Sequence, residues 1–131
     1  MSTHQFPHYP GTGAASETGH DRGKGFTLNI PMPSGSGDQE FTNAFNEIIV
    51  PRADAFKPDL VLISAGFDAH GRDPLSGLEL TSSCYGDLTR LVKGIAERHA
   101  GGKLVSVLEG GYDLQVLRDA IEAHLRALMQ M

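Results

Sequence analysis

Residues 60–74 read LVLISAGFDAHGRDP and join a short apolar run to an acidic turn. The apolar run, residues 60–63, is too uniform for a half-exposed strand and too short for a helix, so it predicts a parallel strand buried on both faces. The small residues at 64–66 then allow the chain to turn. Ligands of open parallel α/β sheets bind just outside the carboxyl ends of strands. The turn therefore indicates either a metal or catalytic site or an ordinary acidic loop, and three ionisable side chains lie in it: Asp68, His70 and Asp73.

The composition is that of one soluble globular domain. The chain has 131 residues, of which 40% are hydrophobic and 21% charged. No apolar run approaches the roughly 20 residues of a membrane span, and no secretory signal is visible. A net charge of −5 without a basic cluster argues against nucleic acid as a direct partner. Cys84 is the only cysteine, which excludes a multi-cysteine metal site and fits a reducing, cytoplasmic location.

Residues 1–24 lack a periodic apolar pattern and predict a long loop rather than a scaffold element. Loops of this length in compact domains are usually either functional or disordered. A tight-turn run at residues 10–13, with Phe6 and Tyr9 beside it, favours a functional loop that lines a channel. Three of the six histidines lie in this loop, and each taken singly is more often a surface or packing residue: His4, His8 and His20.

Helix and strand patterns alternate around residues 60–74, which is α/β order. Residues 26–30 predict a short strand that ends at Pro31. Asp38 is expected to cap a helix that Pro51 kinks or ends. The apolar face of that helix is Phe41, Phe45, Ile48 and Ile49.

A second strand and two further helices follow the acidic turn. Thr81 is expected to cap a helix that ends near Gly101-Gly102, and residues 104–108 predict a second buried strand. Both strands should turn at the same edge of the sheet. The predicted apolar faces are Tyr85, Leu88, Val92 and Ile95 on one helix, and Leu114, Leu117, Ile121, Leu125 and Leu128 on the other.

The second turn, Glu109-Gly110-Gly111-Tyr112, gives the predicted site a partner for Asp68. A carboxylate is a good zinc ligand, and a tyrosine hydroxyl opposite it could donate a hydrogen bond to the oxyanion that forms when water attacks a carbonyl. Glycines before the tyrosine allow close backbone approach. Without further information, a tyrosine that merely packs on the sheet edge is the commoner alternative.

Three long motifs carry a resemblance to a known family: STHQFPHYPGTGAASETG, PDLVLISAGFDAHGRDPL and VLEGGYD. In this order and spacing they resemble the histone deacetylase superfamily, which includes acetoin-utilisation proteins and acetylpolyamine amidohydrolases. The form of the second and third motifs is most similar to class II and bacterial members. The resemblance implies the arginase-deacetylase α/β fold and zinc-dependent removal of acetyl groups from acetylated lysine or acetylated small amines.

The resemblance also implies roles for individual residues. Asp68 matches the carboxylate zinc ligand, and Tyr112 matches the tyrosine that polarises the acetyl carbonyl. His70 matches no ligand of the family, although the spacing of Asp68 and His70 makes a two-ligand site conceivable. The remaining matches are Tyr9, Leu75 and Gly111 at the acyl channel, Ser2 and Thr3 at one potassium site, and Phe26 at a second.

The chain resembles only the C-terminal part of a deacetylase, with residues 1–37 as active-site loop and short strand and residues 38–131 as an αβαβα scaffold. Other members supply two more zinc ligands, in an Asp-x-His pair, and general-base histidines upstream of STHQ. The resemblance therefore implies one zinc ligand of three, an exposed sheet edge that favours association with another chain, and doubtful activity of the chain alone. A non-catalytic remnant or interaction module is the alternative.

Overall fold

The fold is described from a computed structural model for residues 1–129. It contains four parallel strands and four α-helices, with a single 3-10 turn at Asp21–Gly23. In chain order the main elements are β1 (Ser2–Gln5), β2 (Asn29–Met32), α1 (Asp38–Ala44), a π-helical turn (Phe45–Ile49), α2 (Val50–Phe56), β3 (Val61–Ala65), α3 (Ser82–His99), β4 (Leu104–Leu108) and α4 (Leu114–Met129). This is the α/β architecture that the sequence predicts.

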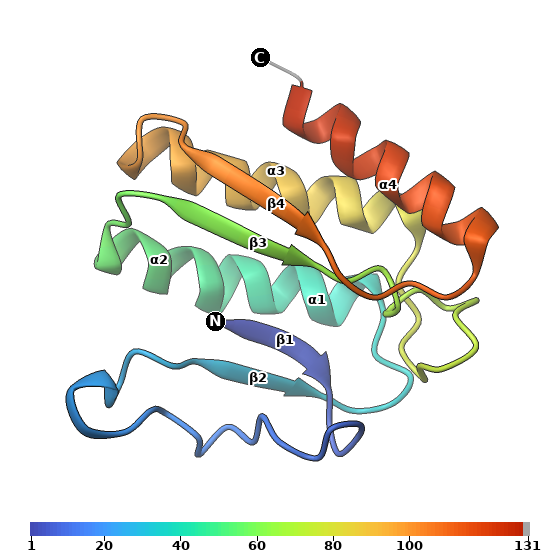
Figure 1. Cartoon of the computed structure of the whole chain (residues 1–131), viewed down its shortest axis with the longest axis horizontal. Coiled ribbons are helices and arrows are strands. Elements are labelled where there is room, and N and C mark those ends of the chain that lie inside the picture. The colour runs from blue at the N-terminus through green and yellow to red at the C-terminus, as the bar shows by residue number, and fades with distance from the viewer. Residues whose placement is uncertain (130–131) are drawn as a thin grey trace.

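The strands form two separate two-stranded sheets within residues 1–129. β1 pairs with β2 in parallel, with Ser2 opposite Asn29, and β3 pairs with β4 in parallel, with Val61 opposite Leu104. All four strands run in the same direction, and β1 and β3 are the inner neighbours (Figure 1). In this view α3 lies behind β4, α1 and α2 run behind the space between β3 and β1, and α4 packs against α3. We call the helix-covered side of the β3–β4 sheet its back face.

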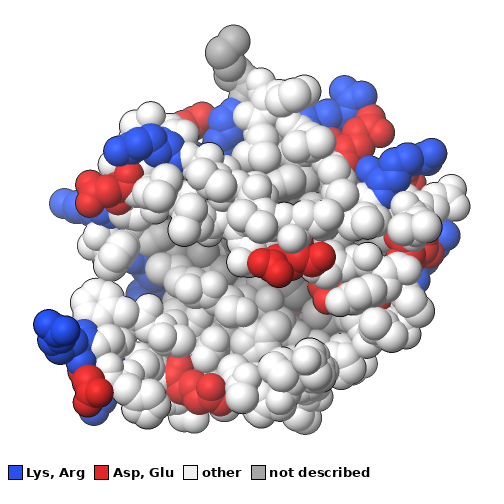
Figure 2. Space-filling view, viewed as in Figure 1, with Lys and Arg blue, Asp and Glu red and all other residues white. Residues whose placement is uncertain are grey.

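The prediction that both central strands are buried on both faces is wrong. Leu62 of β3 is 69% exposed, and Val105 and Val107 of β4 are 48% and 54% exposed. The register places Leu62 opposite Val105 and Ser64 opposite Val107, so these side chains share one surface, which we call the front face. The middle of this surface is largely uncharged (Figure 2). The uniform apolar run is therefore typical of a strand that is covered on both faces, whereas in this structure only its back face is covered.

The prediction that residues 1–24 form a loop is wrong in part, because β1 begins at Ser2. β2 also differs from the predicted strand at residues 26–30, since it begins at Asn29 and runs through Pro31. The amides of Ser2 and Phe6 donate to Leu28 and Met32, so alternate residues of β2 face β1. Pro31 falls on the other set and points away from β1, so its missing N–H costs no ladder bond.

The first helix begins one residue earlier than expected. Gly37 is the N-cap, and its amide donates to the Glu40 carboxylate at 2.8 Å. Asp38 therefore does not cap α1; its carboxylate instead accepts from the amide and hydroxyl of Thr81, at 2.8 and 2.7 Å. Pro51 lies in the first turn of α2, directly after the π-helical turn, so the helical stretch is irregular but not broken.

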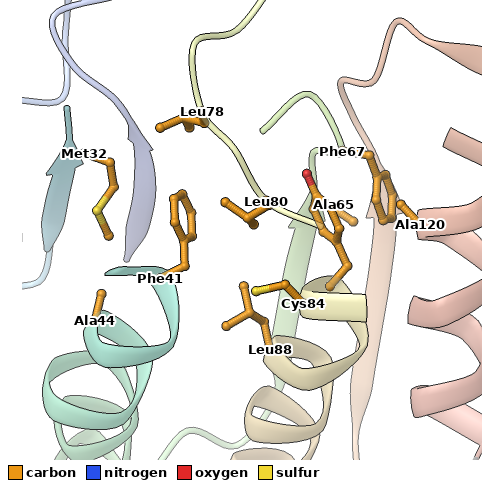
Figure 3. Packing of buried hydrophobic residues seen from close by; sticks show 11 residues of the cluster. Met32, Phe41, Ala44, Ala65, Phe67, Leu78, Leu80, Cys84, Leu88 and Ala120 are labelled. Atoms are coloured by element: carbon orange, nitrogen blue, oxygen red, sulfur yellow. The ribbon is translucent and has the colours of Figure 1, made fainter. Parts of the chain in front are cut away.

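The helix α3 confirms its prediction closely. Thr81 caps it by accepting from the Cys84 amide, and the helix ends at His99 before Gly101 and Gly102, which both have positive φ. Its buried side meets residues from the other elements in one core (Figure 3). That core includes Met32, Phe41, Leu78, Leu80, Phe67, Cys84, Tyr85, Leu88 and Ala120. Burial raises the pKa of the Cys84 thiol to about 12, as expected for an inert core cysteine.

The buried side of α4 is rotated relative to the predicted leucine face. Leu114 is 82% exposed and Leu125 is 48% exposed, whereas Leu117 and Ile121 pack partly against the core. Small residues on both helices allow α4 to approach α3 closely. A Cβ on Gly86 of α3 would lie 3.3 Å from the carbonyl oxygen of Ala123 in α4. The buried residues of α4 are Val116, Ala120, His124 and Ala127. None of the helices within residues 1–129 is long and apolar enough to cross a lipid bilayer.

Candidate functional site

The turns that follow β3 and β4 meet at one edge of the sheet, as the sequence predicts. The Glu109 amide donates to the Ala65 carbonyl at 3.0 Å, and the Phe67 amide donates to the Gly110 carbonyl at 2.8 Å. A pocket of about 720 Å³ opens beside these turns and extends between β1 and β3. Figure 2 shows the hollow on the front of the molecule. Five of the predicted site residues contribute to its lining: Thr3, Tyr9, Asp68, Leu75 and Tyr112.

Asp68 is held against two glycines at the base of the pocket. A Cβ on Gly66 would lie 3.0 Å from Asp68 Oδ1, and a Cβ on Gly110 would overlap Oδ2. The carboxylate therefore occupies space that a side chain at either glycine would take. Burial raises the pKa of Asp68, and the nearby Asp73 adds to this rise. A half-buried carboxylate at the end of a strand is chemically suited to bind a cation.

Asp73 ties the two turns together, a role that the sequence did not reveal. Its side chain is buried, with Oδ1 accepting from the Leu75 amide and Oδ2 from the Tyr112 amide, both at 2.9 Å. One carboxylate thus fixes the backbone of two pocket residues that are separated by 37 positions in the sequence. The sequence signal was only that Asp73 lies in the acidic turn, which does not distinguish a ligand from a support.

Gly111 sets the path of the chain into Tyr112. Its φ is +136°, and a Cβ at this position would lie 2.7 Å from Leu117 Cδ1 and 3.2 Å from Phe67 Cβ. Both the backbone angle and the close packing therefore require glycine. The Tyr112 side chain is 56% exposed and lines the pocket.

The N-terminal segment crosses the pocket and joins the loop after β3. His8 Nε2 lies 2.9 Å from the Leu75 carbonyl oxygen, and the Gly77 amide donates to Gln5 Oε1 at 2.8 Å. Tyr9 is 91% exposed at the pocket rim. His4, by contrast, holds the loop, since its ring bridges the Ser2 hydroxyl and the Gly13 carbonyl.

The other predicted site residues have contacts of their own. His70 accepts from the Arg72 amide at 3.1 Å and lies 3.2 Å from the Ser82 hydroxyl, and it does not line the pocket. The potassium candidates are also divided: Thr3 lines the pocket, the Ser2 amide donates to Leu28, and the Phe26 ring packs edge-on against Phe56 with centroids 6.2 Å apart. Within residues 1–129, no three His, Cys, Asp or Glu side chains are grouped to hold a metal ion.

A buried polar network behind the pocket was missed at the level of sequence. His124 of α4 lies between the Thr89 hydroxyl, 2.7 Å from Nδ1, and the Ser106 hydroxyl, 2.9 Å from Nε2. Thr89 donates its own proton to the Tyr85 carbonyl, so Nδ1 must carry the proton and Nε2 must accept from Ser106. Burial lowers the pKa of His124. The only sequence signal was a histidine within an apolar helix.

Comparison with known proteins identifies the class to which this fold and pocket belong. The histone deacetylase domain family matches residues 1–128. Over 129 residues the chain is 48% identical to histone deacetylase 14, chloroplastic, of Arabidopsis thaliana. This match covers 98% of this chain and 30% of that relative. It is 47% identical over 115 residues to a probable deacetylase of Archaeoglobus fulgidus, covering 88% of this chain and 32% of that protein. A histone deacetylase-like amidohydrolase of Pseudomonas aeruginosa is 44% identical, and the match covers 86% of this chain and 30% of that protein.

Solved structures agree with the sequence comparisons. The HD domain of HDA15 superposes with a TM-score of 0.89 at 38% identity, covering 96% of this chain and 35% of that chain. The histone deacetylase Clr3 gives the same TM-score at 36% identity, and the match covers 96% of this chain and 22% of that chain. This chain belongs to the histone deacetylase family. It spans about a third or less of the length of the relatives that it matches.

Proposed function

We propose that this chain is the C-terminal part of the catalytic domain of a zinc-dependent deacetylase, which hydrolyses the amide of acetylated lysine or of an acetylated small amine. The observation that carries the proposal is the convergence of Asp68 and Tyr112, from two separate turns, on one pocket at the carboxyl ends of β3 and β4. The relatives are named as deacetylases and amidohydrolases. A cytoplasmic location stays a prediction, since two similar relatives are named as chloroplastic.

Asp68 is the residue of this chain that would hold the zinc ion. The space that Gly66 and Gly110 leave for its carboxylate, and the exposure of that carboxylate to the pocket, fit a ligand at this position. A catalytic zinc site normally has three protein ligands, and residues 1–129 group no such set. Two ligands must therefore come from polypeptide outside the described residues. Zinc would supply Lewis-acid polarisation of the amide carbonyl.

Tyr112 is the proposed hydrogen-bond donor to the oxyanion that develops when the amide carbonyl is attacked. A donor of this kind must be positioned before the reaction, because reorganisation during the reaction would reduce its benefit. The Asp73 carboxylate and the close packing at Gly111 fix the Tyr112 backbone, while the ring remains exposed to the pocket. This combination fits a donor that meets a substrate from solvent.

The other proposed roles concern the pocket wall and its rim. Tyr9 and Leu75 would flank an acyl chain that enters towards Asp68, and the His8 contact to the Leu75 carbonyl joins the two loops that carry them. Gly111 does not itself line the pocket, although its neighbours Gly110 and Tyr112 do, so its proposed role is to place Tyr112 at the wall. Ser2 and Thr3 remain candidates for one potassium site and Phe26 for a second. The incomplete ligand set also favours a second function, a non-catalytic interaction module that keeps this fold.

The test is hydrolysis by this chain joined to the part of a deacetylase domain that it does not span. We expect Asp68→Ala to lose zinc and activity together, because the substitution removes a ligand. Tyr112→Phe should retain zinc and lower turnover by about 10²–10³-fold, the typical effect of deleting one oxyanion donor. Zinc content by elemental analysis and turnover of an acetyl-lysine peptide are the measurements.

Tyr85→Phe is the matched control for the tyrosine substitution. Tyr85 also contributes to the pocket lining, but its ring packs against Phe67, with centroids 5.1 Å apart, and the residue is buried. Loss of its hydroxyl should leave turnover within about threefold, a change of well under 1 kcal/mol. A folded, zinc-loaded Tyr112→Phe variant with the turnover of the Tyr85→Phe control would refute the assigned role of Tyr112.

A further inference from the structure

Residues 72–75, which we call the bridge, hold the turn that carries Tyr112 at two adjacent points. The Asp73 carboxylate accepts from the Tyr112 amide at 2.9 Å, and Arg72 Nη2 lies 3.3 Å from Asp113 Oδ2. The Arg72 side chain is 58% exposed, so this ion pair alone contributes little. The buried Asp73 carboxylate is the stronger contact, because a hydrogen bond to an ionised acceptor is stronger than a neutral one.

The bridge is stiff along its own length. Pro74 fixes one backbone angle in its middle, and the Leu75 amide donates to Asp73 Oδ1 at 2.9 Å. The carboxylate that accepts from the Tyr112 amide is therefore the same group that accepts from the Leu75 amide. A displacement of Leu75 would move this carboxylate and, with it, the backbone of Tyr112.

His8 holds the other end of the bridge. Its Nε2 lies 2.9 Å from the Leu75 carbonyl oxygen, and because a carbonyl can only accept, Nε2 must carry the proton. The His8 ring also lines the pocket. Burial raises the pKa of Asp68, and the nearby His8 acts against this rise. The ring is thus close to the site, while its hydrogen bond is made to the bridge.

The contacts that follow in the same loop cannot replace the His8 contact. The Gly77 amide donates to Gln5 Oε1 at 2.8 Å, and the Gly77 carbonyl accepts from the Gly35 amide at 2.7 Å. These bonds anchor the loop without His8. Among the hydrogen bonds of residues 1–129, however, the Leu75 carbonyl accepts only from His8. Loss of the ring would therefore free Leu75 while the loop as a whole stays attached.

We propose that His8 is a positioning residue for Tyr112 and that it acts on Tyr112 through the bridge. Its ring fixes the Leu75 carbonyl, and the Asp73 carboxylate transmits that position to the Tyr112 amide. The proposal rests on the proposed function, in which the Tyr112 hydroxyl donates to an oxyanion. Such a donor must be held in place before the reaction, which gives a distant hydrogen bond an effect on turnover.

Direct binding of substrate by the His8 ring is the alternative, since the ring lines the pocket. The two roles differ in their kinetics. Loss of an interaction that acts only in the transition state lowers kcat and leaves KM unchanged, whereas loss of ordinary substrate binding raises KM and leaves kcat unchanged. Kinetic measurements can therefore distinguish the positioning role from the binding role.

The first test compares His8→Gln with His8→Asn in this chain. The glutamine amide has an N–H group at about the same distance from Cβ as His8 Nε2, whereas the asparagine amide is one carbon shorter and should not reach Leu75. We expect His8→Asn to shift the NMR signals of the Leu75 and Tyr112 amides, and His8→Gln to leave both close to the parent. The Val61 amide, which donates to Lys103 before the distant end of β4, is the internal control.

The second test places the same two variants in this chain joined to the part of a deacetylase domain that it does not span. His8→Asn should lower kcat for an acetyl-lysine peptide by about 2–10-fold, the effect of one net hydrogen bond, with KM and zinc content unchanged. His8→Gln should restore kcat to within about twofold of the parent. When Tyr112→Phe is also present, His8→Asn should have no further effect, because the group that it positions is gone.

Three results would overturn the proposal: an unchanged Tyr112 amide signal in His8→Asn, a rise in KM without a fall in kcat, or an equal fall in kcat with and without the Tyr112 hydroxyl. Circular dichroism confirms that the variants are folded. If the joined parent does not hydrolyse the peptide although it holds zinc, the proposed deacetylase function fails. The NMR comparison then still decides whether His8 positions Tyr112.

Discussion

The two faces of the β3–β4 sheet are made from similar residues and have different surroundings. On the back face, Ala65 is buried and Ser106 bonds to His124 of α4. On the front face, Leu62, Val105 and Val107 are all about half exposed or more. The strands have apolar side chains on both faces, but this chain provides helices for only one.

This difference separates what a strand sequence encodes from what a chain can bury. The side chains of β3 and β4 suit a sheet that is covered on both faces, and such a sheet exposes the apolar side chains of one face when one helical layer is absent. An exposed contiguous apolar surface is typical of an interface. The contrast between the faces therefore favours a chain that functions as part of a larger domain, and substitutions can test each face.

The largest expected difference in stability is between two leucine-to-alanine variants, one in the core and one on the front face. Leu80 is 2% exposed in the core, so Leu80→Ala should lower the free energy of unfolding by about 2–5 kcal/mol. Leu62→Ala, at a side chain already in water, should change it by no more than about 0.5 kcal/mol. Urea unfolding of both variants measures the difference. Equal losses would contradict the assignment of the front face as uncovered.

Sequence patterns predicted the back of the molecule better than its front. The helical spacing of Tyr85, Leu88 and Ile95 correctly gave the buried side of α3, because burial against one layer follows local periodicity. Val92, the fourth predicted position, is only partly buried and lines the pocket. The run at residues 60–63 was read as doubly buried, since no local signal reports whether a second layer exists. On α4, the leucine spacing gave a face rotated from the buried one, because the close approach to α3 selects small residues such as Ala120 and Ala127.

For the candidate site, the sequence predicted that Asp68 and Tyr112 lie close together, but it did not predict the role of Asp73. Asp68 and Tyr112 follow strands, and the rule that parallel strands end at one edge was sufficient to bring them together. The role of Asp73 depends on which backbone amides reach it, and those amides come from both turns. Such a contact is set by tertiary packing, so the spacing of the residues in the sequence could not give it.

A smaller loss of stability is expected from a substitution at Asp73, which joins the turns at the carboxyl ends of β3 and β4. Asp73→Asn should destabilise the chain by about 1–3 kcal/mol, because one backbone amide that now donates to a carboxylate oxygen would meet an NH₂ group. Asp59→Asn is the matched control, since Asp59 is exposed just before β3. Urea unfolding together with the NMR chemical shift of the Tyr112 amide should show both a loss of stability and a local change only for Asp73→Asn. An unchanged Tyr112 amide would contradict the tie between the turns.

The smallest expected effect is the pH dependence that His124 gives to the back face. Burial lowers the pKa of His124 from its ordinary value of 6.5, and the neutral ring satisfies Thr89 and Ser106 at once. The unfolded chain takes up a proton near pH 6.5, whereas the folded chain does so only at lower pH. The stability that the neutral ring contributes is therefore present above pH 6.5 and falls as the pH drops below it.

The measurement is urea unfolding of the parent chain and of His124→Gln at intervals from pH 7.5 to pH 5. The chain has five other histidines, so the difference between the parent and the variant isolates the contribution of His124. The parent should lose more stability than the variant on acidification, because protonation of a buried ring favours the unfolded state. The effect should be smaller than that of Leu80→Ala, since protonation removes no packed atoms. If the two pH profiles run parallel, the ring is not held neutral by burial, and the back face is less tightly closed than the structure indicates.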